Sequence, residues 1–73
     1  MTHRMAVLNA SGHSPVEWDL EEPETVEHAR LAFNNYREAG YAAFQEHVDE
    51  TIQVLDFDPH AENTVFLAPI AGG

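Results

Sequence analysis

The sequence contains no cysteine and no lysine among its 73 residues. Without cysteine the chain can form no disulfide framework, no thiolate zinc site and no thiol-based active site. It also has no apolar run approaching the roughly 20 residues that cross a bilayer, and residues 1–4 lack the basic-then-apolar pattern of a signal peptide. We therefore expect a soluble, cytoplasmic protein that makes no use of a membrane.

Positive charge is scarce. The chain contains thirteen Asp and Glu residues but only three Lys or Arg residues, all of them arginine. Its formal net charge is -10. Such a surface repels a phosphate backbone, which argues against direct binding of nucleic acid. A protein partner with a basic docking surface is the natural counterpart, although high negative charge also serves simply to keep a small protein in solution.

Features of catalytic and phosphate-binding sites are also missing. The glycines, at positions 12, 40, 72 and 73, form no cluster ahead of a helix, and there is no lysine to reach a phosphate. Ser11, His13 and Ser14 share one short turn, where neighbouring side chains do not form an oriented pair of nucleophile and base. The sequence therefore does not predict an enzyme.

The densest group of potential metal ligands is Asp56, Asp58, His60 and Glu62. Pro59 interrupts the ligand pattern of a calcium loop, and the glycine that such a loop requires is absent. No two histidines are four residues apart on the predicted helix, as a zinc site on a helix would need. We interpret the segment as a solvated acidic turn and predict neither a metal site nor a bound cofactor.

The first half of the chain predicts a β-hairpin followed by a helix. Residues 5–9 form an apolar strand, 10–15 form a turn, and in 16–20 apolar and acidic residues alternate, which together indicate a hairpin over 5–20. Acidic residues and Pro23 then precede a run of helical periodicity over 24–39. Gly40 is suited to end this helix in the left-handed conformation. Trp18 and Phe33 are expected in the core.

The second half predicts three more strands within 41–68, namely 41–45, 51–57 and 64–68, followed by an extended tail over 69–73. The resulting order is ββαβββ, with no repeat or linker. We therefore expect a single α+β domain over 1–73, in which one mixed sheet is covered on one face by one helix.

The tail Pro69-Ile70-Ala71-Gly72-Gly73 is the most informative functional feature. It directly follows the apolar strand Val65-Phe66-Leu67, and Pro69 separates tail from strand because proline cannot donate to the sheet. Glycine has no Cβ, so a tail with Gly72 and Gly73 can enter a narrow channel and present its carboxylate to an active site. A frayed terminus, or a tail that packs on a neighbouring subunit, remains the alternative.

Three segments resemble the ubiquitin-like β-grasp sulfur carriers, a family that includes the small subunit of molybdopterin synthase and the thiamine sulfur carrier. The tail over 65–73 is similar to the family's apolar strand followed by proline, an apolar residue, a small residue and Gly-Gly. Glu24-Thr25-Val26-Glu27 resembles the start of the family's single helix. The segment 57–63 lies where the family has an acidic turn before its last strand.

The resemblance implies that the Gly73 carboxylate, preceded by Gly72, is activated by a partner. An adenylating enzyme would use ATP to convert it to an acyl adenylate, and a sulfur donor or the amine of an acceptor protein would then give a thiocarboxylate or a conjugate. The chain itself would have no catalytic residue. Docking of the partner is expected to involve the strand end and the tail, that is Phe66, Leu67, Ala68, Pro69, Ile70 and Ala71.

The absence of lysine limits this hypothesis, because the chain offers no lysine for lysine-linked chains of itself. Sulfur carriage and single conjugation to other proteins both remain open. A different class of function is also open: a small acidic binding or structural protein, such as a phage or mobile-element component, whose tail docks in an assembly without activation.

Overall fold

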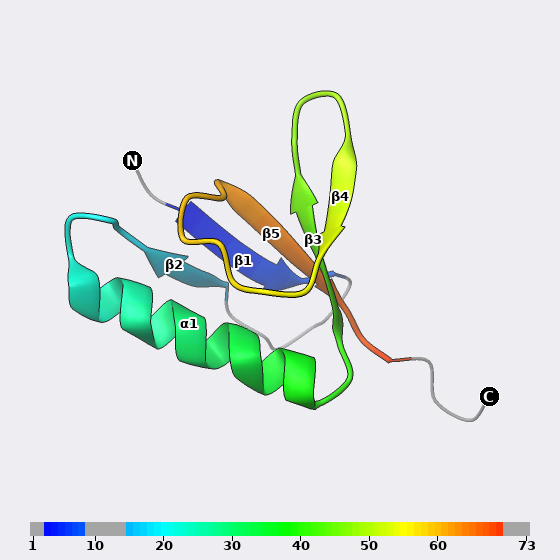
Figure 1. Ribbon diagram of the computed structural model, residues 1–73, viewed down its shortest axis with the longest axis horizontal. Coiled ribbons are helices and arrows are strands. Elements are labelled where there is room, and N and C mark those ends of the chain that lie inside the picture. The colour runs from blue at the N-terminus through cyan, green and yellow to red at the C-terminus, as the bar shows by residue number, and fades with distance from the viewer. Residues whose placement is uncertain (1–2, 9–14, 70–73) are drawn as a thin grey trace.

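The computed structural model describes residues 3–8 and 15–69, which form one helix and five strands in the predicted order ββαβββ (Figure 1). A hairpin precedes the helix, and three strands follow it. None of the described residues belongs to a helix that is long and apolar enough to span a membrane. The elements are β1 (His3–Val7), β2 (Val16–Trp18), α1 (Pro23–Glu38), β3 (Ala42–Glu46), β4 (Thr51–Val54) and β5 (Asn63–Leu67).

The strands form one mixed sheet in the order β2-β1-β5-β3-β4. β1 and β5 are parallel, and every other neighbouring pair is antiparallel. The last strand, β5, therefore lies in the middle of the sheet, and α1 packs across one face (Figure 1). The predicted α+β architecture, with a mixed sheet and a single helix, is confirmed.

The start of α1 is fixed by hydrogen bonds that tie it to the end of the hairpin. Pro23 occupies the first turn, where its missing N–H costs nothing, and Glu24 lies near the positive end of the helix dipole. The Thr25 hydroxyl accepts a hydrogen bond from the backbone N–H of Asp19 at 2.9 Å and lies 2.7 Å from the Glu22 carbonyl oxygen, to which it donates. The side chain of Thr25 thus joins strand and helix at the predicted boundary.

Gly40 ends the helical segment in the conformation that the sequence predicts, with φ at +92°. The turn is closed by a hydrogen bond from the Tyr41 backbone N–H to the Tyr36 carbonyl, 3.0 Å long. A Cβ added at Gly40 would lie 3.7 Å from the Pro69 side chain, which is ordinary contact. The need for glycine here therefore comes from the backbone rather than from crowding.

We expect Gly40→Ala to lower the free energy of unfolding by about 1 kcal/mol, because an L side chain is strained at this positive φ. Gly40→Asn should cost less, since asparagine tolerates left-handed backbone better than alanine does. Urea denaturation of the three proteins measures the difference. Equal stability of the alanine and glycine forms would contradict the positive φ at this turn.

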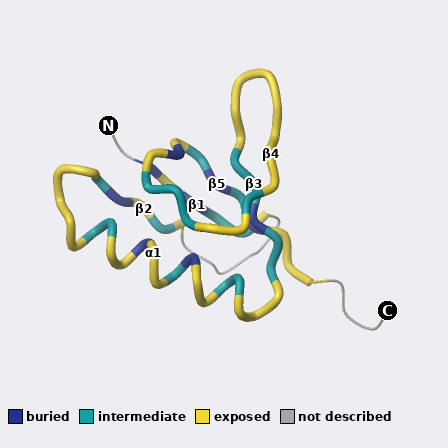
Figure 2. The backbone as a smooth tube through the Cα atoms, viewed as in Figure 1, coloured by how far each residue is buried: buried dark blue, intermediate teal, exposed yellow. Residues whose placement is uncertain are grey.

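The core lies between α1 and the sheet, and its buried positions are distributed over the helix and the strands (Figure 2). Most of its large side chains are aromatic rings. Trp18 and Phe33 are each 1% exposed, so their predicted core positions are confirmed. Phe33 contacts Phe66 with ring centroids 5.4 Å apart, and Phe66 contacts Tyr36 at 4.7 Å. These rings, with Met5 on β1, join the central strands of the sheet to the helix.

The helix, β3 and β5 are each displaced by one residue from the predicted ranges 24–39, 41–45 and 64–68, and larger differences occur at β1 and β4. The first strand begins at His3 rather than Met5, because the His3 ring is buried, stacks on Trp18 and lies 2.9 Å from the Ala61 carbonyl oxygen. β4 ends at Val54, whereas a strand was predicted through Phe57. The Phe57 ring instead turns into the core, 5.2 Å from Trp18, so the chain leaves the edge of the sheet earlier.

The predicted strand over 16–20, in which apolar and acidic residues alternate, is also observed only as far as Trp18. Val16 and Trp18 lie on the helix side of β2, as predicted, because they pair with Met5 and His3 of β1. The strand ends at Trp18, and Leu20, which was expected on the same buried face, is 40% exposed in the loop before α1.

Candidate docking face at the base of the C-terminal tail

The central strand β5 leads directly to the predicted tail. After Leu67 the chain leaves the sheet through Ala68 and Pro69, both exposed. Pro69 lies beside Gly40, so the base of the tail rests against the turn that ends the helical segment. The predicted docking residues Ile70 and Ala71 and the activated Gly72 and Gly73 lie outside the described residues, as do Ser11, His13 and Ser14.

Side chains of β5 alternate between the two faces of the sheet, which separates residues that the sequence analysis grouped together. Phe66 was predicted to be a docking residue, but its side chain is 0% exposed and packs between the sheet and α1. It therefore supports β5 from inside the core and presents no surface to a partner. Val65 and Leu67 point to the opposite face, where Leu67 is 41% exposed.

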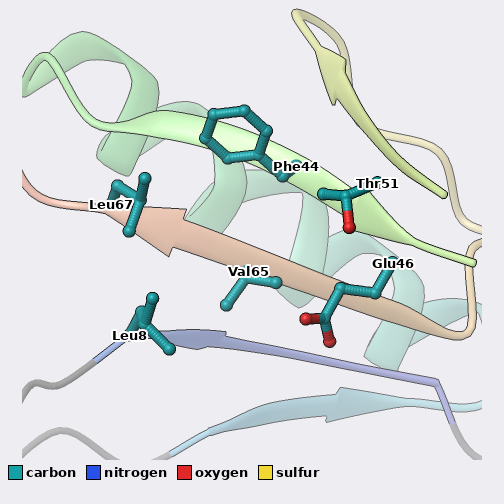
Figure 3. Close-up of a pocket in the computed structure, with 6 residues that line it drawn as sticks. All are labelled: Leu8, Phe44, Glu46, Thr51, Val65 and Leu67. Atoms are coloured by element: carbon teal, nitrogen blue, oxygen red, sulfur yellow. The ribbon is translucent and has the colours of Figure 1, made fainter.

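The face opposite α1 carries a shallow apolar hollow (Figure 3). The strand register explains how it forms, since Val65 of β5 lies between Ala6 of β1 and Phe44 of β3. The hollow measures about 220 Å³. No described helix or loop covers it, as α1 lies behind the sheet in this view. The residues that line it, called the outer face below, are Leu8, Phe44, Glu46, Thr51, Val65 and Leu67.

The outer face adjoins the point at which the chain leaves the sheet. Leu67 is both the last residue of β5 and part of the lining, and Leu8 follows the neighbouring parallel strand at the same end. Leu8 is 51% exposed, so it adds accessible apolar surface beside Leu67, which is 41% exposed. The segment that begins at Ala68 therefore starts next to the outer face.

Sequence reasoning identified Leu67 but missed Leu8 and Phe44. Phe44 lies on β3 and Leu8 directly follows β1, and the register of both strands against β5 depends on pairing between distant parts of the chain. The available signal was the alternation Ala42-Ala43-Phe44-Gln45-Glu46, which places Phe44 and Ala43 on opposite faces. Only the burial of Ala43 against the helix side shows that Phe44 lies on the outer face of the sheet.

Two of the three arginines form hydrogen bonds with neighbouring groups, and the strand register places the third opposite a glutamate. Arg4 lies opposite Glu17 in the pair β1–β2, Arg30 forms an ion pair with Glu27, and the Arg37 guanidinium donates to the Tyr41 carbonyl at 2.7 Å. The hydrogen bond from Arg30 holds the pKa of Glu27 below its ordinary value. The side chains of Arg30 and Glu27 are both solvent-exposed. With a net charge of -10, the chain as a whole is strongly acidic.

The segment predicted to be a solvated acidic turn is organised by Asp58. Its carboxylate accepts hydrogen bonds from the Gln45 side chain at 3.2 Å and from the His60 backbone N–H at 2.9 Å. Within residues 3–8 and 15–69, no three His, Asp or Glu side chains come together in an arrangement that would hold a metal ion. The turn borders a polar groove of about 400 Å³ beside the β3–β4 hairpin.

The chain matches no protein-family model, no curated protein and no solved structure. Interpretation of the outer face therefore depends on its own chemistry. It offers an apolar hollow that begins beside the base of the tail and has an acidic residue, Glu46, at its opposite end, next to Asn63. Apart from Glu46 and Thr51, the described residues that line it are apolar.

Proposed function

We propose that this chain is a small, non-enzymatic ubiquitin-like carrier or modifier with a β-grasp fold, activated at the Gly73 carboxylate by a partner enzyme. The observation that carries the proposal is the position of β5. It is the central strand, it places Val65 and Leu67 on an uncovered apolar face, and it is followed directly by Ala68 and Pro69, the described start of the segment that leads to Gly72-Gly73.

In this proposal the outer face and the tail have different roles, and both are needed. The outer face gives an activating enzyme an apolar contact that does not depend on the tail sequence. With that contact made, the residues after Pro69 are held near the partner, which raises their effective concentration at its active site. Gly72 and Gly73 lack side chains, so they fit a narrow channel that a bulkier residue would block.

Activation would proceed in two steps on the partner. A carboxylate oxygen of Gly73 attacks the α-phosphorus of ATP, forming a mixed anhydride with AMP and releasing pyrophosphate. Hydrosulfide, or an amine of an acceptor protein, then attacks the acyl carbon and AMP leaves. The product is a thiocarboxylate or an amide, and the residues of this chain supply only the carboxylate and the docking surfaces.

The charge of the chain indicates the chemistry of the partner. With a net charge of -10 and Glu46 at the rim of the outer face, the complementary surface is apolar at its centre and rich in arginine or lysine around it. Association with such a partner should be fast at low salt and slower as the ionic strength rises.

The experiment that tests the proposal is intact-mass spectrometry after incubation of the protein with an adenylating enzyme from the same genome, ATP and a sulfur donor. We expect the mass to rise by the exchange of one oxygen for sulfur, or by conjugation. Deletion of Gly73 should abolish the change, while the Leu31→Asp protein, altered at an exposed position of α1, should still be modified.

A purely structural role gives a different result. If the protein binds a partner through the outer face but its mass never changes with ATP, and deletion of Gly72-Gly73 leaves its role in the host intact, then the chain is an acidic docking protein and not a carrier. In that case the proposed activation of Gly73 is wrong, while the proposed binding through the outer face is supported.

A further inference from the structure

We infer that β4 is a second interaction surface, which binds an extended, basic-flanked segment of a partner protein by adding it to the sheet as a sixth strand. The inference is independent of any activation of the tail. It starts from the strand order, in which β4 and β2 are the two edges.

The two edges differ in how well they are protected against pairing with another chain. β2 has only three residues, with Pro15 before it and Glu17 at its centre, and its neighbour α1 packs against it. β4 has the sequence Thr51-Ile52-Gln53-Val54, without charge, proline or bulge. Natural edge strands are normally blocked by such features, so an unblocked one indicates use as a binding edge.

The backbone groups on the free edge of β4 belong to Thr51 and Gln53. The hairpin is closed by a hydrogen bond from the His47 N–H to the Glu50 carbonyl, 2.8 Å long. Bonded and non-bonded pairs alternate along an antiparallel ladder, so Ile52 and Val54 bond to β3 while Thr51 and Gln53 point their N–H and C=O groups outward. Both outward residues are exposed.

Exposed apolar side chains accompany this edge. Val48 at the tip of the hairpin is fully exposed, Leu55 just after β4 is 68% exposed, and Ile52 is 42% exposed. The β3–β4 hairpin projects from the body of the domain, so an approaching segment meets no other described element (Figure 1). An added strand would cover these side chains as well as the free backbone groups.

The acidic residues around β4 indicate which kind of segment binds to this edge. Acidic residues flank β4 on both sides, with Asp49 and Glu50 before it and Asp56 and Asp58 after it. A second copy of the chain would bring acidic ends against acidic ends in either orientation, in addition to the net charge of -10 on each copy. A segment of four or five β-forming residues with lysine or arginine at both ends matches the same edge in charge.

The test uses a synthetic peptide of alternating valine and threonine with two lysines at each end, titrated into the labelled full chain and followed by NMR. We expect shifts concentrated at β4 and slower hydrogen exchange of the Thr51 and Gln53 amides in the complex. A matched peptide with glutamate in place of lysine should bind at least about tenfold more weakly.

Two variants isolate the backbone contact. Gln53→Pro removes an outward N–H without removing a bond to β3, and should weaken binding of the lysine peptide by about tenfold. Gln53→Ala also loses the side chain but keeps the N–H, and should bind like the wild type. Equal affinity of the two variants, shifts centred on Val65 and Leu67 instead of β4, or unchanged exchange at Thr51 and Gln53 in the wild type would each overturn the inference.

Discussion

Replacing Phe66 by alanine is expected to lower the free energy of unfolding by about 3 to 5 kcal/mol, the range for truncating a fully buried aromatic ring. Phe66 is 0% exposed and contacts both Phe33 and Tyr36, so its removal leaves a cavity at the junction of the central strand and the helix. A domain of this size has a total stability of roughly 4 to 11 kcal/mol. The variant should therefore be partly unfolded at modest urea concentrations.

Leu67→Ala is the matched comparison, because the next residue along the same strand points to the opposite face. Leu67 is 41% exposed on the outer face, so its truncation should cost only about 1 kcal/mol. Urea denaturation followed by Trp18 fluorescence measures both variants. Similar losses for the two would contradict the division of β5 into a core-facing and an outer-facing row.

The second large effect is expected from a charge on the outer face. Leu67→Asp should reduce kcat/KM for activation by a partner enzyme by about tenfold to a hundredfold, since a leucine buried in an interface contributes about 1.5 to 3 kcal/mol. Steady-state kinetics at fixed ATP and varied protein concentration measure the loss, which should appear mainly in KM.

Leu31→Asp provides the control for this substitution. Leu31 is 54% exposed on α1, which covers the other face of the sheet, so the chemical change is the same but the docking face is untouched. Circular dichroism should show both variants folded. Equal kinetic loss in the two would mean that charge alone, and not the outer face, governs recognition.

Most of the fold could be predicted from local patterns. The alternation at Val16 and Trp18, the helical period through Ala29 and Phe33, and the glycine that ends the helix all depend on neighbours in the sequence. Each is a short-range effect of side-chain spacing or backbone conformation, and a single sequence contains it. The errors occur where a distant residue decides the outcome, as when the contact of Phe57 with Trp18 ends β4 early.

The docking face was harder to predict for the same reason. Its lining joins Leu8, Phe44 and Leu67, which come from three strands far apart in the chain, and the parallel pairing of β1 with β5 brings them together. Phe66 was assigned to docking because an apolar run beside a tail does not show which of its residues faces the core. Burial of the alternate residues on two neighbouring strands was needed to decide it.

The central claim is that the Gly73 carboxylate is activated, and ATP–pyrophosphate exchange tests that step alone, without a known sulfur donor or acceptor. The account predicts that the full chain, added to its adenylating enzyme, supports incorporation of labelled pyrophosphate into ATP. The chain lacking Gly73 should support none, and Leu67→Asp should support it only at raised protein concentration. Exchange that is independent of Gly73, or absent with every adenylating enzyme of the genome that encodes the chain, would contradict the account.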